Sequence, residues 1–201
     1  MMNQSESLGT ARPRWFFTRG RDMKKKLLCI LVLCALLTVP VNAKPIVSKM
    51  SGKSMEPTIM QDNEVYFVPY GETFPVIINL TPYMVPVKEK PERYDIVMYM
   101  TEGEYWCGRI IGMENETLEI KEGYVFINDF IEPEDELYKK EPMLGSFGPY
   151  QIPEDHYFIM GDNRNNSKDG RFRDEQYVSI DDIMGVAVCN QTSGVMYMEV
   201  K

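Results

Sequence analysis

The sequence is poor in histidine and cysteine, the usual ligands of zinc. It has one histidine, His156, and four cysteines, of which Cys29 and Cys34 lie in an apolar run near the start. Cys107 and Cys189 are far apart in the chain, and no zinc-ligand spacing is present. We therefore expect neither a metal nor another cofactor. Cys107 and Cys189 could form a disulfide in an oxidising compartment or remain as two buried thiols, and the sequence leaves both open.

Long apolar runs are also absent, with one exception. Residues 27–41 follow Lys24, Lys25 and Lys26 and contain no charge over fifteen positions. A transmembrane helix needs about 20 apolar residues and at least about 17. A signal peptide cut after Ala43 fits as well, because a basic stretch, a short apolar region and small residues before the cut are typical of one. We favour a retained anchor in the cell membrane.

This interpretation predicts three segments. Residues 1–22 are an extension that we expect to be disordered, 23–43 are the membrane anchor or signal peptide, and 44–201 are an exported domain. Basic residues before the apolar run favour a single pass with the carboxy-terminal domain outside the cytoplasm. If the chain were cut after Ala43, the domain would be secreted instead.

Basic residues are scarce in the exported domain. The first 43 residues hold seven of the 22 basic and two of the 30 acidic residues, which leaves 15 and 28 in residues 44–201, a net charge of −13. A domain this acidic is a poor binder of nucleic acid, and we expect no nucleic-acid partner.

The exported domain also lacks patterns typical of long helices. Short apolar runs of strand length, together with eleven of the chain's thirteen prolines, predict that residues 44–201 form a mainly β domain. The predicted strands are residues 95–100, 118–120, 124–127, 156–160, 183–188 and 195–200, and Lys121-Glu122-Gly123 predicts a hairpin turn. Residues 70–93 and 131–151 are rich in proline or glycine, so we expect long surface loops there.

Two polar segments are candidates for chemistry. Ser54 lies between Gly52, which allows a close turn, and Pro57. Alone, such a serine is usually a turn residue. The second segment runs from Gly161 to Arg171, directly after a predicted strand. Its basic residues would repel a cation, so a buried polar network that positions other groups fits better than a calcium site.

Together the two segments resemble the signatures of type I signal peptidases, which are serine endopeptidases that remove signal peptides from exported proteins. Ser54-Met55-Glu56-Pro57-Thr58 is similar to their nucleophile box, and the segment from Gly161 to Arg171 is similar to their second signature loop. Residues 92–97 and 109–112 lie between these in the expected order. The resemblance implies a coiled β-sheet domain with an N-terminal apolar helix, acting at a lipid membrane.

The resemblance also implies roles for residues. Ser54 matches the nucleophile, and its own N–H would help to hold the oxyanion. Ser167 matches the hydroxyl that orients the base, and Asp169 and Arg171 match a supporting ion pair. Asp162, Asn163 and Arg164 belong to the same loop, where Asp162 and Asn163 would shape the turn. Met55 is expected in the wall of the pockets that accept small residues before the cut.

The sequence departs from the family pattern at the general base. The family keeps a lysine directly before the arginine of the Arg109-Ile110-Ile111-Gly112 segment, and here that position is Gly108. Glycine cannot take the proton of a serine hydroxyl. Lys53, Cys107, Lys168 and His156 are the alternatives that we considered, and His156 is chemically the most suitable.

Two functions follow from these observations. The first is a membrane-bound serine endopeptidase that removes signal peptides after small residues, with Ser54 as nucleophile. The alternative is a catalytically impaired pseudoenzyme or peptide-binding β domain, which Gly108 favours.

Overall fold

The computed structural model describes residues 45–71, 73–78, 81–134 and 141–197. The chain divides into two compact units, Met1–Pro40 and Val41–Lys201, and all described residues belong to the second. The predicted extension and the apolar segment at residues 23–43 lie outside the described residues. Within those residues, no helix is long and apolar enough to cross a membrane.

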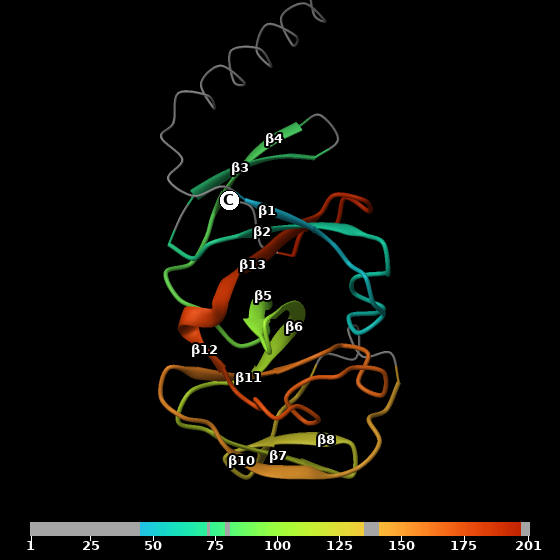
Figure 1. The fold of residues 1–201 in the computed structure, drawn as a ribbon, viewed down its shortest axis with the longest axis vertical. Helices are drawn as coiled ribbons and strands as arrows, with labels where there is room; N and C mark the ends of the chain where they lie inside the picture. Colours follow the sequence, from blue (N-terminus) through green and yellow to red (C-terminus); the bar gives the residue numbers. More distant parts are fainter. Residues whose placement is uncertain (1–44, 72, 79–80, 135–140, 198–201) are drawn as a thin grey trace, which may run out of the picture. The chain divides into compact units, whose positions relative to one another are not determined.

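The second unit is built from antiparallel strands, which confirms the predicted mainly β fold (Figure 1). Its largest sheet has seven strands in the order β1-β2-β13-β5-β6-β11-β12. These are β1 (Ile46–Lys49), β2 (Glu64–Val68), β13 (Ile183–Asn190), β5 (Ile96–Thr101), β6 (Glu104–Gly112), β11 (His156–Met160) and β12 (Val178–Ser179). A short 3-10 helix, Ile180–Asp182, joins β12 to β13.

A second sheet has the order β10-β7-β8-β9. Its strands are β7 (Thr117–Lys121), β8 (Tyr124–Ile127), β9 (Phe130–Ile131) and β10 (Phe147–Gln151). β7 and β8 pair across the predicted turn, where Glu122 and Gly123 both have positive φ. Such angles are required by the tight turn of a two-residue hairpin.

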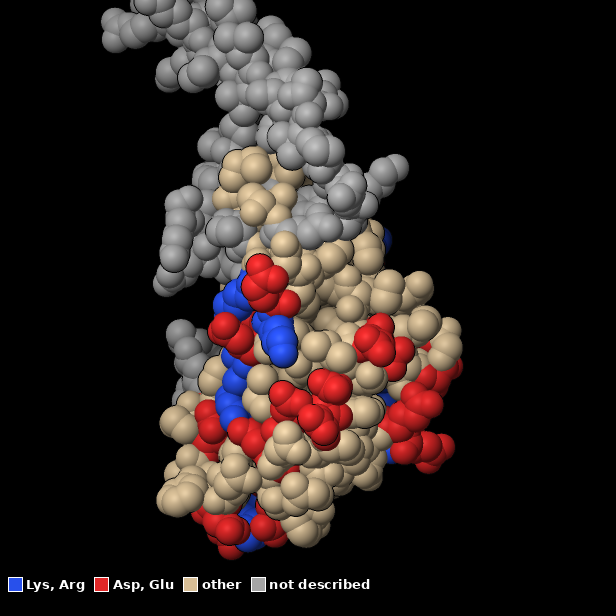
Figure 2. Space-filling view, turned by 90° about the vertical axis from the view of Figure 1, so that its left-hand side faces the viewer, with Lys and Arg blue, Asp and Glu red and all other residues tan. Residues whose placement is uncertain are grey.

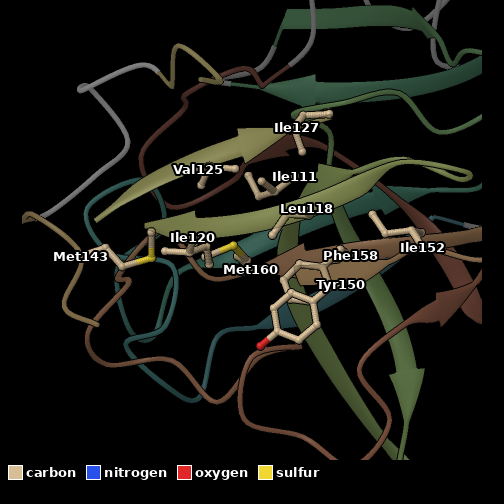
Figure 3. Packing of buried hydrophobic residues seen from close by; sticks show 10 residues of the cluster. All are labelled: Ile111, Leu118, Ile120, Val125, Ile127, Met143, Tyr150, Ile152, Phe158 and Met160. Atoms are coloured by element: carbon tan, nitrogen blue, oxygen red, sulfur yellow. The ribbon is translucent and has the colours of Figure 1, made fainter. Parts of the chain in front are cut away.

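Ten buried residues join the second sheet to the ends of β6 and β11 (Figure 3). Tyr150 packs on the ring of Phe158 with centroids 4.7 Å apart. Met160, the last residue of β11, is fully buried in the same cluster. Burying apolar surface of this kind stabilises a domain by about 25 cal/mol per Å². Met160 is therefore held by its packing, and so is the start of the polar loop at Gly161.

The prediction that residues 70–93 form only a loop is wrong. β3 (Thr73–Ile78) and β4 (Thr81–Pro86) form a two-stranded antiparallel ribbon in this region. Pro75 lies opposite Met84, and Pro82 lies opposite Ile77. Each strand of a two-stranded ribbon has one edge without a partner, so a proline without an N–H is tolerated there. The long-loop expectation for 131–151 is also too simple, because β10 lies within it.

The end of the chain forms less regular structure than its alternating pattern predicts. In the described part of residues 195–200, Met196 makes an isolated bridge to Cys189. Cys189 and Cys107 are both free thiols, and Cys189 is completely buried. Of the two states that the sequence left open, the structure has the reduced one.

Acidic side chains are spread over the face shown in Figure 2, with a narrower band of basic side chains among them. This distribution agrees with the net negative charge of residues 44–201. Charge of this size favours solubility and influences association with charged partners, but it does not determine the fold.

Candidate functional site

The Ser54 turn lies between β1 and β2 and is closed by backbone hydrogen bonds. Met50 N–H donates to the Asn63 carbonyl at 2.9 Å, and the Ile59 N–H donates to the Met55 carbonyl at 2.9 Å. Met55 and Ile59 are completely buried, whereas Ser54 is half-buried. The two apolar side chains therefore anchor the turn in the core while the serine faces the surface.

A cavity of about 110 Å³ adjoins Ser54. Eleven residues line it: Ser48, Lys49, Met50, Ser51, Gly52, Ser54, Phe67, Met98, Tyr105, Trp106 and Cys107. The apolar part of this lining comes from Met50, Phe67 and Met98, and Met55 is not among the lining residues. Met55 instead packs behind the cavity in the same core cluster as these three.

The loop after β11 is hydrogen-bonded to the Ser54 turn through Asn163. The Asn163 N–H donates to the Ser54 carbonyl at 2.9 Å, and its side-chain amide donates to the Lys53 carbonyl at 2.9 Å. Asn163 is 1% exposed, so these hydrogen bonds are shielded from water. A buried donor left without a partner would cost about 1–3 kcal/mol, which makes the arrangement specific.

Asp162 joins the same turn to β6. Its carboxylate accepts two hydrogen bonds from Arg109, at 2.8 and 2.7 Å, and a third from the Thr58 hydroxyl at 2.5 Å. Asp162 is completely buried. Bidentate arginine–carboxylate pairs are strong and directional, so Arg109, Asp162 and Thr58 fix the turn against the strand.

Asp169 and Arg171 form an ion pair inside the loop. Arg171 donates from Nε and Nη2 to the two carboxylate oxygens of Asp169, both at 2.8 Å. Asp169 also accepts from the Gly161 N–H at 3.1 Å, and Arg171 donates to the Arg164 carbonyl at 2.6 Å. These contacts bring the two ends of the loop together.

Arg164 is 1% exposed and extends away from Ser54 toward a carboxylate. It donates to both oxygens of Glu134 and, through Nε, to the Gly161 carbonyl at 3.0 Å. Glu134 follows β9, so this pair connects the loop to the second sheet. A buried arginine requires such a partner, because an unpaired buried charge is strongly unfavourable.

Gly161 allows Ser167 to approach the Ser54 turn. A Cβ atom at Gly161 would lie 2.6 Å from the Ser54 carbonyl oxygen and closer still to the Ser167 hydroxyl. The two serines are therefore neighbours, as the resemblance implies. Within the described residues, neither serine hydroxyl has a hydrogen-bond partner in the protein.

Gly108 lies on β6 opposite Val97 of β5. Its neighbour Cys107 lines the Ser54 cavity, and Arg109 on the other side pairs with Asp162. A Cβ atom at Gly108 would meet the Cγ2 methyl of Ile159 at 2.5 Å and the Met160 carbonyl oxygen at 3.2 Å. Ile159, which is 1% exposed, fills the space where a longer side chain would start.

His156, Lys168 and Lys53 are not among the described residues that line the Ser54 cavity. His156 opens β11, whereas the loop near Ser54 follows the other end of that strand, and His156 lines a different cavity with Asp174 and Asp182. Lys168 is paired with Glu102 at 3.1 Å and is more than half exposed. Lys53 is exposed on the surface.

Three titratable residues line the Ser54 cavity: Cys107, Lys49 and the exposed Tyr105. Burial, and to a smaller extent the Asp162 carboxylate, raise the pKa of the Cys107 thiol well above its ordinary value, so the thiol is neutral at physiological pH. Lys49, which the sequence did not single out, is paired with Asp62 at 3.0 Å with its side chain 61% exposed. A lysine acts as a general base where it is desolvated, and Lys49 is not.

Comparison with known proteins identifies the family. The model of the signal peptidase family, peptidase S26, matches residues 23–190, and the chain belongs to this family. Signal peptidase I of Bacillus amyloliquefaciens is 34% identical over 159 residues, covering 75% of this chain and 76% of that protein. Signal peptidase I T of Bacillus subtilis is 35% identical over 156 residues, covering 73% and 72%.

A solved structure is also similar to part of the chain. The crystal structure of a signal peptidase I from Enterococcus faecalis matches with a TM-score of 0.41 and 29% identity, covering 48% of this chain and 96% of that one. The family assignment depends on the sequence matches and not on this structure.

Proposed function

We propose that this protein acts on the signal peptides of exported proteins at a membrane, with Ser54 in the nucleophile position of a serine endopeptidase. The observation that carries the proposal is that hydrogen bonds from the 161–171 loop hold the Ser54 turn in place. Asn163 holds the two carbonyls at Lys53 and Ser54, and Asp162 holds Thr58. Such positioning by buried groups is what a nucleophile requires.

The cavity beside Ser54 supports recognition of small side chains. Its volume of about 110 Å³ has room for a small side chain together with adjoining peptide atoms, and Met50, Phe67 and Met98 supply apolar contacts. Small pockets distinguish side chains by only about 1–3 kcal/mol per methylene. Attachment to the membrane near the signal peptide would add selectivity, and the family match begins at residue 23, so it includes the apolar run.

A second candidate is binding of signal peptides without efficient hydrolysis. Gly108 has no side chain, and Ile159 fills the adjoining space. The described residues that line the Ser54 cavity offer only a neutral thiol, an exposed lysine and an exposed tyrosine as titratable groups. Loss of a general base typically lowers the rate by several orders of magnitude, although oxyanion and substrate binding can survive it.

One experiment separates the two candidates. A signal peptide with small residues at the first and third positions before the cut is incubated with the detergent-solubilised full chain and with its Ser54→Ala variant. Cleavage by the wild type alone supports the peptidase. If neither protein cleaves, but both bind the peptide in a fluorescence anisotropy assay, binding without hydrolysis is supported. Absence of both cleavage and binding by folded protein would refute both candidates.

A further inference from the structure

Arg173 lies beside the Ser54 cavity and is held in a fixed orientation. Its guanidinium carbon is 3.7 Å from the centroid of the Trp106 ring and 5.6 Å from that of Tyr99. Its Nε donates to the Lys168 carbonyl at 2.8 Å. Arg173 is 6% exposed, and Trp106 is one of the residues that line the cavity.

Two donors in this stack have no acceptor. The indole Nε1 of Trp106 and the Nη1 of Arg173 are both buried and make no hydrogen bond with any described residue. Both are N–H groups, so neither can satisfy the other. Each of these two donors, on side chains that stack on one another, needs an oxygen acceptor.

The charge of Arg173 restricts which acceptor suits this place. Within the described residues, no carboxylate lies within 4.0 Å of its guanidinium. Asp169 is already paired with Arg171, and Glu175 accepts from the Thr101 hydroxyl at 2.5 Å. The aromatic rings stabilise a desolvated cation by about 2 kcal/mol or more. The hydrogen bond from Thr101 and, to a smaller extent, the charge of Arg173 lower the pKa of Glu175, but the two side chains form no ion pair. A neutral acceptor would satisfy the N–H groups without adding a paired negative charge.

We propose that Arg173 and Trp106 form a carboxylate-binding subsite next to the Ser54 cavity. One carboxylate oxygen would accept from Arg173 Nη1 and a second from Trp106 Nε1. Both donor atoms are buried in the free protein, so the side chains must move apart to admit a carboxylate, and a peptide in the cavity that Trp106 lines would supply it. This last step rests on the proposed peptide-binding function. The carboxylate is either an acidic side chain of the peptide or its free carboxy terminus.

The subsite is tested first without any peptide. The chain has two tryptophans, Trp15 and Trp106, so the Trp106 indole N–H resonance of the full chain in detergent can be assigned with the Trp106→Phe variant. Sodium acetate is titrated against sodium chloride at equal ionic strength. We expect a saturable shift of this resonance with acetate, absent in Arg173→Gln. If the wild-type resonance responds equally to both salts, the subsite does not exist.

Peptides then identify the source of the carboxylate. One signal-peptide fragment is made with a carboxy-terminal acid or amide, and the amide form is made with Glu or Gln at one position. A charge-assisted pair predicts at least about tenfold tighter binding of one acid form than of its neutral counterpart. Arg173→Gln should remove that difference, and Arg173→Lys should retain part of it because it keeps the charge without the planar fork.

The outcomes distinguish this inference from the proposed function. Equal binding of acid and neutral peptides by the wild type overturns the inference while peptide binding stands. Failure of every peptide to bind, with acetate still shifting the Trp106 resonance, overturns the peptide-binding function while the subsite stands.

Discussion

Restoring a lysine at position 108 should require a second change at Ile159. In Gly108→Lys, the new Cβ atom meets Ile159 Cγ2 at 2.5 Å, a separation that real Cβ atoms essentially never show. Gly108 does not have a positive φ, so the cost of the substitution is steric and not conformational. Overpacking of this kind typically costs about 1–3 kcal/mol. We expect the single variant to be destabilised by this amount, with little gain in cleavage.

Ile159→Ala should relieve the collision at its own cost. Ile159 is 1% exposed and packs with Val97, Tyr99 and Ile110. Truncating such a side chain alone costs about 2–5 kcal/mol through lost burial and the cavity that remains. In the double variant the lysine stem occupies part of that cavity. The losses in free energy of unfolding should therefore be non-additive. The double variant should be more stable, by about 0.5–3 kcal/mol, than the sum of the two single-variant losses predicts.

The activity of the double variant tests the assignment of the base position. A positioned general base contributes about 10²–10⁴ in rate. We expect Gly108→Lys with Ile159→Ala to cleave a signal peptide at least about 100-fold faster than the wild type, measured by mass spectrometry of the products. The matched control is Gly108→Met with Ile159→Ala, which fills the same space without an amine.

Two results would refute this reasoning. If the folded lysine variant cleaves no faster than the methionine control, the missing amine at 108 is not what limits the rate. If Gly108→Lys alone is as stable and as active as the double variant, Ile159 does not obstruct the position. Addition of Ser54→Ala to the double variant must abolish any gain in activity, because the gain depends on the serine hydroxyl.

Three further predictions concern the groups around Ser54. Asn163→Ala removes the amide that donates to the Lys53 carbonyl, and it should lower the free energy of unfolding by about 1–3 kcal/mol in urea denaturation. The control Asn166→Ala, at an exposed neighbour, should have almost no effect. Equal losses in the two variants would contradict the assigned role of Asn163. Asp162→Ala removes the carboxylate that accepts two hydrogen bonds from buried Arg109, and it should lower the free energy of unfolding by about 3–5 kcal/mol. Adding Arg109→Met to the same chain should recover part of this loss. No recovery would argue against the importance of the pair. Because burial raises the pKa of Cys107 in the folded state, the thiol of the unfolded chain ionises at lower pH. The free energy of unfolding should therefore fall above about pH 8.5, and it should fall less in Cys107→Ala. Identical pH profiles of the two proteins would contradict this expectation.

Much of the sheet could be predicted from local pattern. The run from His156 to Met160 and the hairpin around Gly123 form strands with the predicted bounds or within one residue of them. Both segments are buried or alternate cleanly, so their own residues determine their structure. The ribbon formed by β3 and β4 was missed because its prolines argue against strands in general, although a two-stranded ribbon tolerates them.

The contacts around Ser54 could not be predicted from the sequence. Ser54, Asn163 and Ser167 were chosen by motif, and nothing in a linear sequence shows that Asn163 holds the Ser54 carbonyl. The obstruction by Ile159 was also out of reach, because it depends on the pairing of β11 with β6. Neighbours across a sheet are separated by tens of residues, so only the folded chain reveals them.

The packing of Ile159 against Gly108 also has an evolutionary consequence. If lysine replaces Gly108 first, its side chain collides with Ile159. If Ile159 is shortened first, a cavity opens in the core. Either order of single substitutions passes through a less stable intermediate. A lysine at 108 therefore requires two coordinated substitutions, and the packing of Gly108 against Ile159 protects each residue against a single change.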